Sequence, residues 1–134
     1  MTSAEPLPDD RHLAIRVMAG PADTNAAGDI FGGWIMSQVD IAGSVIARRR
    51  ARGRIVTVAV NAFQFHHPVF VGDLISCYAE VTRVGHTSLT VHVKAYAERH
   101  GERDEYIQVT EADVTYVAVD ENRRPRTIKP ARLD

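Results

Sequence analysis

Apolar and polar positions divide this chain into one long apolar helix and a series of alternating segments. From Gly33 to Arg50 there is no proline, and apolar residues lie on nearly every face of the first half. Arg48 to Arg50 and the following Gly53 are typical of a helix C-terminus. At about 1.5 Å per residue, this segment predicts a helix of roughly 27 Å. Its apolar pattern predicts burial on most sides.

The remaining segments alternate as strands do. His12–Val17 predicts a first strand before the helix, and four further strands are expected after it, at residues 55–65, 74–84, 88–98 and 106–119. Turn signals separate the last four: Pro68, Gly72-Asp73, Gly85 and the polar segment 100–104. Strands joined by such short connections predict an antiparallel sheet.

The order of elements predicts an α+β protein in which a five-stranded antiparallel sheet wraps around a long central helix. One sheet cannot cover an apolar helix on all sides, so a second copy is expected to close the other side as a C₂ dimer. Residues 11–129 are predicted to form a single domain. Residues 1–10, with two prolines and three acids, predict a disordered N-terminal tail, and residues 130–134 a C-terminal tail.

Composition restricts the classes of function. The 134 residues carry a net charge of −1, so no overall charge favours nucleic acid. No apolar run reaches the roughly 18–20 residues that a membrane span requires, and residues 1–10 lack the apolar core of a signal peptide. The single cysteine, Cys77, excludes an intrachain disulfide and is expected in the core. A cytoplasmic protein that binds neither nucleic acid nor membranes is expected.

Asp40 is the most informative residue, because it stands in the middle of the apolar helix. The residues at helical spacing carry no positive charge: Met36, Ser37, Gly43 and Ser44. A buried unpaired carboxylate is costly, and such a group is usually kept because something polar, often a substrate, meets it. The polar, glycine-rich loop 23–33 leads directly into this helix. Loop, helix start and carboxylate together predict an active site.

Several motifs in order resemble the YciA-like bacterial branch of the acyl-CoA thioesterases, which have the hotdog fold. The resemblance runs from about Leu13 to Ile128. It rests on residues 21–25 (PADTN), 28–36 (GDIFGGWIM), 38–40 (QVD), 56–60 (VTVAV), Pro68, 71–73 (VGD), 84–85 (VG), 117–120 (VAVD) and 126–128 (RTI). It departs from the family at Ala27, at His86 and at the pair His66-His67, which puts acyl chain length and CoA contacts in question more than activity.

The resemblance implies a site in which Asp40 is the catalytic carboxylate, Asn25 contributes from the loop, and Gly32 and Gly33 are the glycine pair at the helix start. It also implies a site at the dimer interface, so that Asn25 and Asp40 can come from opposite subunits. The expected assembly is a trimer of dimers, a hexamer. No metal and no cofactor are expected, since CoA is part of the substrate and product.

These residue types suit thioester hydrolysis. A helix N-terminus offers unpaired N–H groups to an oxyanion, and Gly32 and Gly33 let a thioester approach them. Asp40 can act as general base on water or as nucleophile, and Asn25 can hold water or the thioester oxygen. Other interpretations remain open: the glycines can serve packing, Asn25 a turn, and Asp40 a structural contact across the dimer interface.

Contacts with the CoA portion are also predicted. The candidates are Thr57, Arg83, Gly85, His86, Thr87, Ser88 and Arg126. Two basic groups, around Arg48–Arg54 and around Arg126 and Lys129, fit the phosphates of CoA. The first group fits a solvated helix end equally well, since cations complement the C-terminus of a helix.

The sequence therefore predicts an enzyme, an acyl-CoA thioesterase that releases free acid and CoA. A hotdog hydratase or dehydratase is one alternative, although no histidine accompanies Asp40 in the helix motif. A non-catalytic acyl-CoA sensor is another. A Ser37-based triad lacks the Gly-x-Ser-x-Gly motif. The adjacent His66 and His67 are expected to point to opposite faces of a strand, and no zinc spacing, phosphate loop or dinucleotide motif occurs.

Overall fold

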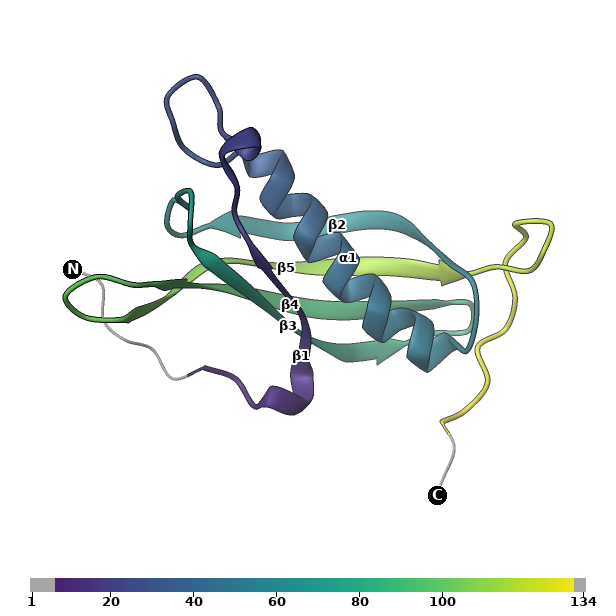
Figure 1. Cartoon of the computed structure of the whole chain (residues 1–134). Helices are drawn as coiled ribbons and strands as arrows, with labels where there is room; N and C mark the ends of the chain where they lie inside the picture. The colour runs from purple at the N-terminus through teal and green to yellow at the C-terminus, as the bar shows by residue number, and fades with distance from the viewer. Residues whose placement is uncertain (1–6, 132–134) are drawn as a thin grey trace.

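Five antiparallel strands and one long helix follow one another in the predicted order (Figure 1). The computed structural model describes residues 7–131. Helix α1 spans Gly32–Ala51, and the strands are β1 (Leu13–Met18), β2 (Ile55–Phe65), β3 (Leu74–Val84), β4 (Ser88–Arg99) and β5 (Glu105–Ala118). The sheet has the order β1-β3-β4-β5-β2, so β1 and β2 are its edges. This confirms the predicted hotdog fold, with the helix lying across one face of a five-stranded sheet.

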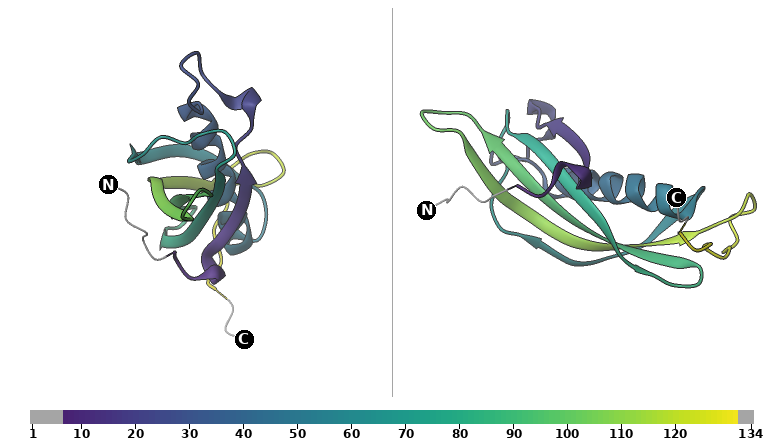
Figure 2. Two further views of the ribbon diagram at one scale, coloured as in Figure 1. Left: turned by 60° about the vertical axis from the view of Figure 1, so that its left-hand side comes forward. Right: turned by 90° about the horizontal axis from the view of Figure 1, so that it is seen from below.

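The sheet curves around the helix, as the view from below in Figure 2 shows. Strand β2 pairs with β5 through two irregularities of register, and Ala62 within the second has φ 52°. Such bulges bend a strand and increase its twist. The bends bring β2 beside the helix, where its outer edge remains unpaired within the described part of the chain.

Side-chain alternation places the core between helix and sheet. In β4, the inward residues Leu89, Val91 and Val93 are fully buried. The helix face that meets them consists mainly of small residues, which let the helix lie close to the strands. Its buried members are Ile35, Val39, Ala42, Gly43, Ala47 and Ala51. Cys77 belongs to the same cluster, and burial raises the pKa of its thiol to about 12, as expected for a small core residue.

Another apolar face of the molecule is uncovered in the single chain. About half of the side chain of Ile41 on the helix and of Val58 on β2 is exposed. The exposed apolar residues of α1, β1, β2 and the segment before α1 are Met18, Phe31, Met36, Ile41, Val58 and Phe65. The prediction of a helix covered on most sides is therefore not fulfilled by one chain.

The helix ends differently from the expected glycine stop. Arg52, with φ 57°, adopts the left-handed conformation, and its N–H donates to the carbonyl of Arg48 at 2.9 Å. Gly53 follows with φ 147°, and a Cβ there would lie 3.0 Å from Nη2 of Arg126. The glycine is thus needed one residue after the cap, where the C-terminal segment packs against the helix end.

The predicted tails fall partly outside the described residues, which exclude 1–6 and 132–134. Within the N-terminal range, Asp10–His12 forms a short 3-10 helix whose N-cap, Asp9, accepts from the N–H of Arg11. The division into tails and domain stays a prediction. Among residues 7–131, none of the helices is both long and apolar enough to cross a bilayer.

Candidate active site

Asp40 lies in the middle of α1, and its carboxylate is held from the sheet. The Thr57 hydroxyl on β2 donates to Oδ1 of Asp40 at 2.8 Å, and the Tyr116 hydroxyl on β5 lies 3.1 Å from the same oxygen. No residue from 7 to 131 forms a hydrogen bond with Oδ2. Asp40 is half-buried in the single chain. The structure thus corrects the expectation of a buried unpaired carboxylate: one oxygen is held and the other is free.

Tyr116 is a site residue that the sequence interpretation missed. It is fully buried on the inner face of β5, and its hydroxyl also donates to the backbone carbonyl of Asp40 at 2.8 Å. The signal available in the sequence was a tyrosine at an inward position of the last strand, together with Gly43 one turn after Asp40. Neither residue indicates the contact until the strand register is known.

The start of α1 offers free backbone donors. The helix is preceded by Phe31, which provides no side-chain cap, and its first turn contains no acidic residue. The N–H groups of Gly32 and Gly33 have no acceptor among residues 7–131. A Cβ on Gly32 would meet the Phe65 ring at 3.0 Å, whereas one on Gly33 would enter open space. Packing therefore explains the first glycine, and Gly33 borders solvent.

Asn25 braces the loop before the helix. Its side-chain Oδ1 accepts from the N–H of Ala27 at 2.9 Å and of Asp29 at 3.1 Å, which is the turn role considered from the sequence. Its amide nitrogen has no hydrogen-bond partner among the described residues. Asn25 lines a cleft of about 370 Å³ that also reaches Gly32 and Phe65. The side chain can therefore brace the loop and still donate into the cleft.

One chain does not bring the two halves of the predicted site together. Gly32 and Asp40 are eight residues apart in the same helix, which corresponds to about 12 Å along its axis. The loop with Asn25 lies beyond the helix start (Figure 1). A single thioester carbonyl cannot contact both the helix N-terminus and Asp40 of the same chain.

The two adjacent histidines both line the Asn25 cleft. They follow the last residue of β2, so the strand alternation on which the expectation of opposite faces rested does not apply to them. His66 lies 3.4 Å from a carboxylate oxygen of Glu111. The hydrogen-bond partners of the Asp40 carboxylate in the described chain include no histidine.

The turn between β3 and β4 lies at the other end of the molecule, beside the C-terminal segment. The Gly85 N–H donates to the Ser88 carbonyl at 2.7 Å, and the carbonyls of His86 and Thr87 accept from Ile128 and Ala118. Arg83 is exposed just before this turn. These four turn residues and Arg83 are therefore remote from the Asn25 loop.

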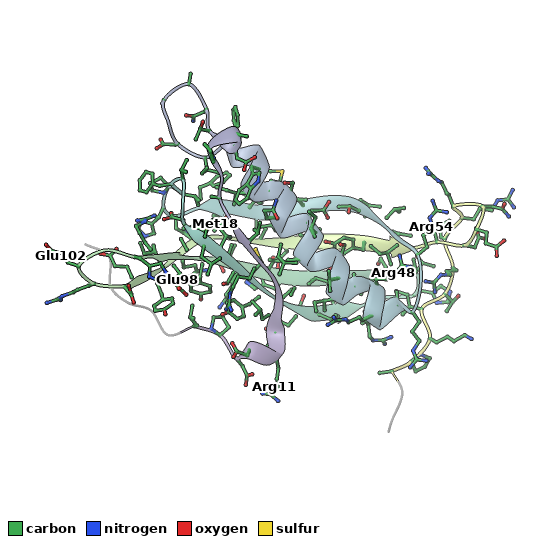
Figure 3. All side chains as sticks on the ribbon, viewed as in Figure 1. Arg11, Met18, Arg48, Arg54, Glu98 and Glu102 are labelled. Carbon is green, nitrogen blue, oxygen red and sulfur yellow. The ribbon has the colours of Figure 1, made fainter. Side chains whose placement is uncertain are left out.

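Arg126 has a structural role. Its guanidinium donates to the backbone carbonyls of Val119, Ala51 and Arg54, so three of its five N–H groups are used. It ties the C-terminal segment to the end of α1 and the start of β2. A cleft of about 630 Å³ there is lined by Arg50, Arg52, Arg126 and Lys129 among others. In Figure 3, Arg48 and Arg54 lie at this same end, opposite Glu98 and Glu102.

Other chemistries find little support in this arrangement. Ser37 uses its hydroxyl to donate to the Trp34 carbonyl at 2.7 Å. Within residues 7–131, no three His, Cys, Asp or Glu side chains are grouped so that they could hold a metal ion. The prominent chemistry is a fixed carboxylate, a helix start with free N–H groups and a basic cleft.

Comparisons with known proteins point to one family. The model of the Thioesterase superfamily matches residues 27–103. The chain is 48% identical over 120 residues to an uncharacterized acyl-CoA thioester hydrolase of Buchnera aphidicola subsp. Baizongia pistaciae, covering 88% of this chain and 89% of the relative. It is 44% identical over 118 residues to the acyl-CoA thioester hydrolase YciA of Escherichia coli strain K12, covering 87% and 89%.

Among solved structures, a hexameric thioesterase from Yersinia pestis superposes with a TM-score of 0.86 at 44% identity, covering 92% of this chain and 100% of that chain. The chain belongs to the thioesterase superfamily. Within it, the YciA acyl-CoA thioester hydrolases are its homologues, and the resemblance stated from the motifs is confirmed.

Proposed function

We propose that this protein is an acyl-CoA thioesterase that hydrolyses acyl-CoA to a carboxylic acid and CoA. The observation that carries the proposal is the Asp40 carboxylate, held on Oδ1 by Thr57 and Tyr116 with Oδ2 free of other contacts. A carboxylate fixed in this way is suited to act on one bound substrate. The acyl-CoA thioester hydrolase homologues give the substrate class.

The active site is proposed to be composite. Because the helix start and Asp40 of one chain lie about 12 Å apart, Asn25 and the Gly32-Gly33 N–H groups of one subunit are paired with Asp40 of another. The free edge of β2 and the exposed Ile41 and Val58 beside it supply a surface for this contact. A hexamer, as in the Yersinia pestis relative, provides such pairs as a trimer of dimers.

In the proposed reaction, the thioester carbonyl oxygen faces the free N–H groups at the helix start, which stabilise the negative charge that develops on it. Oδ2 of Asp40 accepts a proton from water as the water oxygen attacks the carbonyl carbon. The C–S bond then breaks, and the CoA sulfur takes up the proton. With Asp40 as nucleophile, Oδ2 attacks the carbonyl carbon, the C–S bond breaks and CoA leaves as its thiolate. Water then hydrolyses the anhydride to the carboxylic acid and the Asp40 carboxylate, and a proton released in this step ends on the CoA sulfur.

The CoA nucleotide is proposed to occupy the basic end of the molecule. The cleft lined by Arg50, Arg52, Arg126 and Lys129 offers several cations to its phosphates. Thr57, at Asp40, is assigned to the reacting end instead. Arg83 and the turn residues Gly85, His86, Thr87 and Ser88 remain candidates for contacts near the nucleotide. No cofactor is proposed, and the cytoplasm, where a single buried thiol stays reduced, is the proposed compartment.

The test is CoA release measured with a thiol reagent on acetyl-, short-, medium- and long-chain acyl-CoAs, for the wild type and Asp40→Asn. The variant keeps the shape of the side chain and removes its charge. Turnover is expected to fall by about three orders of magnitude or more, with the assembly intact on light scattering. Ligand binding without turnover in both proteins would instead indicate a non-catalytic acyl-CoA sensor.

A further inference from the structure

The Tyr116 hydroxyl contacts Asp40 at two points, the backbone carbonyl at 2.8 Å and Oδ1 at 3.1 Å. The Thr57 hydroxyl donates to the same oxygen, Oδ1 of Asp40, at 2.8 Å. A donor shared between the main chain and the carboxylate of one residue restricts both χ angles of that residue. Since both hydroxyls meet at Oδ1, they restrict rotation of the carboxylate, and Oδ2 is left without a hydrogen-bond partner among residues 7–131.

The helix is shaped to admit this hydroxyl. A Cβ built on Gly43 would lie 2.4 Å from the Tyr116 oxygen and 3.2 Å from its Cζ. Gly43 is fully within a helix and has no positive φ, so backbone freedom does not explain a glycine there. A glycine in a helix interior costs about 0.5–1 kcal/mol relative to alanine. The space for the tyrosine hydroxyl is the structural reason for that residue.

Tyr116 remains a donor at all ordinary pH values. Burial, with the Asp40 carboxylate beside it as a further cause, raises the pKa of the Tyr116 hydroxyl far above its usual value. Tyr116 is fully buried between sheet and helix, so it contacts the carboxylate from inside the fold.

We propose that Tyr116 is a positioning residue for the thioesterase reaction, and that Gly43 exists to let its hydroxyl reach Asp40. The inference rests on the proposed function of Asp40. Tyr116 does not touch the substrate: it holds Oδ1 so that Oδ2 is aimed at the reacting carbon or water. Loss of the contact leaves the carboxylate present and charged but held by the Thr57 hydroxyl alone.

Steady-state kinetics of Tyr116→Phe, Gly43→Ala and the double variant test this. Misplacing a reacting group by about 1 Å can cost about 100-fold in rate, so kcat is expected to fall about 10- to 100-fold in each single variant. KM is expected to change by less than about twofold, because substrate contacts are unaltered. Gly43→Ala displaces the hydroxyl without removing it, and should add little once Tyr116→Phe has removed it.

The matched control is Tyr78→Phe. Tyr78 is also a buried tyrosine of the sheet, and its hydroxyl has no hydrogen-bond partner among residues 7–131. Its kcat is expected to equal that of the wild type. The kcat of each variant is calculated per folded and assembled protein. Light scattering checks the assembly, and thermal unfolding checks the fold. A purely structural role of Tyr116 would lower the unfolding temperature and leave kcat of the folded enzyme unchanged.

The outcomes distinguish failure of the positioning role of Tyr116 from failure of the proposed function of Asp40. If Asp40→Asn is inactive while Tyr116→Phe and Gly43→Ala keep the wild-type kcat, the positioning role is wrong and the proposed function stands. If Asp40→Asn is as active as the wild type, the chemistry assigned to Asp40 fails and the inference fails with it. Strictly additive losses in the double variant, or an equal loss in Tyr78→Phe, would also overturn the positioning role.

Discussion

Some individual side chains in this protein have structural roles that their residue type alone does not indicate. Asp73 is an example: its side chain is 4% exposed, and it accepts from Nε and Nη2 of Arg99 at 3.0 and 2.8 Å and from the Phe70 N–H at 2.9 Å. Arg99 in turn lies over the Phe70 ring, 4.6 Å from its centre. This ion pair fixes the segment between β2 and β3 to the end of β4, next to the Asn25 cleft.

Asp73→Asn should therefore destabilise the protein. Removing one partner of a buried ion pair costs about 3–5 kcal/mol, and because Arg99 is 28% exposed and can turn to solvent, about 2–3 kcal/mol is expected. The free energy of unfolding in urea measures this. Asp9→Asn is the control, since its ion pair with Arg11 is exposed and should be dispensable. Equal effects of the two substitutions would contradict the argument.

At the scale of elements, helix α1 supplies two parts of the proposed site from two places along its length. Its start presents unpaired N–H groups, and its middle carries Asp40 against β2 and β5. The two glycines at the start are not equivalent, because Gly32 packs against Phe65 and Gly33 faces open space. If Gly33 is kept for substrate access, its substitution should raise the free energy of unfolding and lower the activity.

Gly33→Ala is expected to raise the free energy of unfolding by up to about 1 kcal/mol, because alanine favours the helix. The same methyl group would stand where the thioester approaches, and kcat/KM should fall at least about tenfold. Ser37→Ala, an exposed change one turn further on, should leave kcat/KM unaltered. A Gly33→Ala enzyme that is both more stable and fully active would remove Gly33 from the site.

At the scale of the whole molecule, the single chain is incomplete in two respects. Apolar residues of α1, β1 and β2 are exposed, and the groups proposed to be catalytic, the helix start and Asp40, lie too far apart in one chain to act on one carbonyl. A second copy placed along the free edge of β2 would cover the exposed apolar residues and would also bring the helix start of one chain close to Asp40 of the other. Assembly and activity should consequently be lost together.

Light scattering at micromolar concentration should detect no monomer of the wild type. Val58→Asp places a charge on the exposed apolar face of β2, where about half of the Val58 side chain is exposed in the single chain, and should yield a folded monomer without thioesterase activity. Leu7→Asp, an equally apolar exposed position before β1, is expected to keep both. A monomeric wild type with full activity would refute the composite site.

The charge distribution of the molecule gives a second test. Because salt screens exposed charges, with a Debye length of about 10 Å at 0.1 M, KM for acyl-CoA should rise with ionic strength, while KM for a short pantetheine thioester should not. Arg52→Gln at the basic cleft should weaken the salt response. Arg11→Gln, in the short helix before β1 and apart from Arg48 and Arg54 (Figure 3), serves as control. The same salt response for both substrates would exclude phosphate binding there.

The sequence by itself determined the elements and their order. Apolar periodicity located α1 within one residue at each end and gave β2 and β3 their observed bounds, because these patterns depend on which faces are buried. An aspartate in an apolar helix was enough to select Asp40, and the motifs around it were enough to indicate the family. The prediction of a second copy also came from the apolar helix alone, and it stays a prediction for this chain.

Only the tertiary structure decided which groups meet. Tyr116 and Asp40 are 76 residues apart, and their contact depends on the register of β5 and on the absence of a side chain at Gly43. Arg126 was expected at phosphate, and the close approach of the C-terminal segment gives it a second role that the sequence did not indicate, as a donor to three backbone carbonyls. Local patterns carry information about burial, whereas hydrogen bonds between distant residues depend on how the elements pack together.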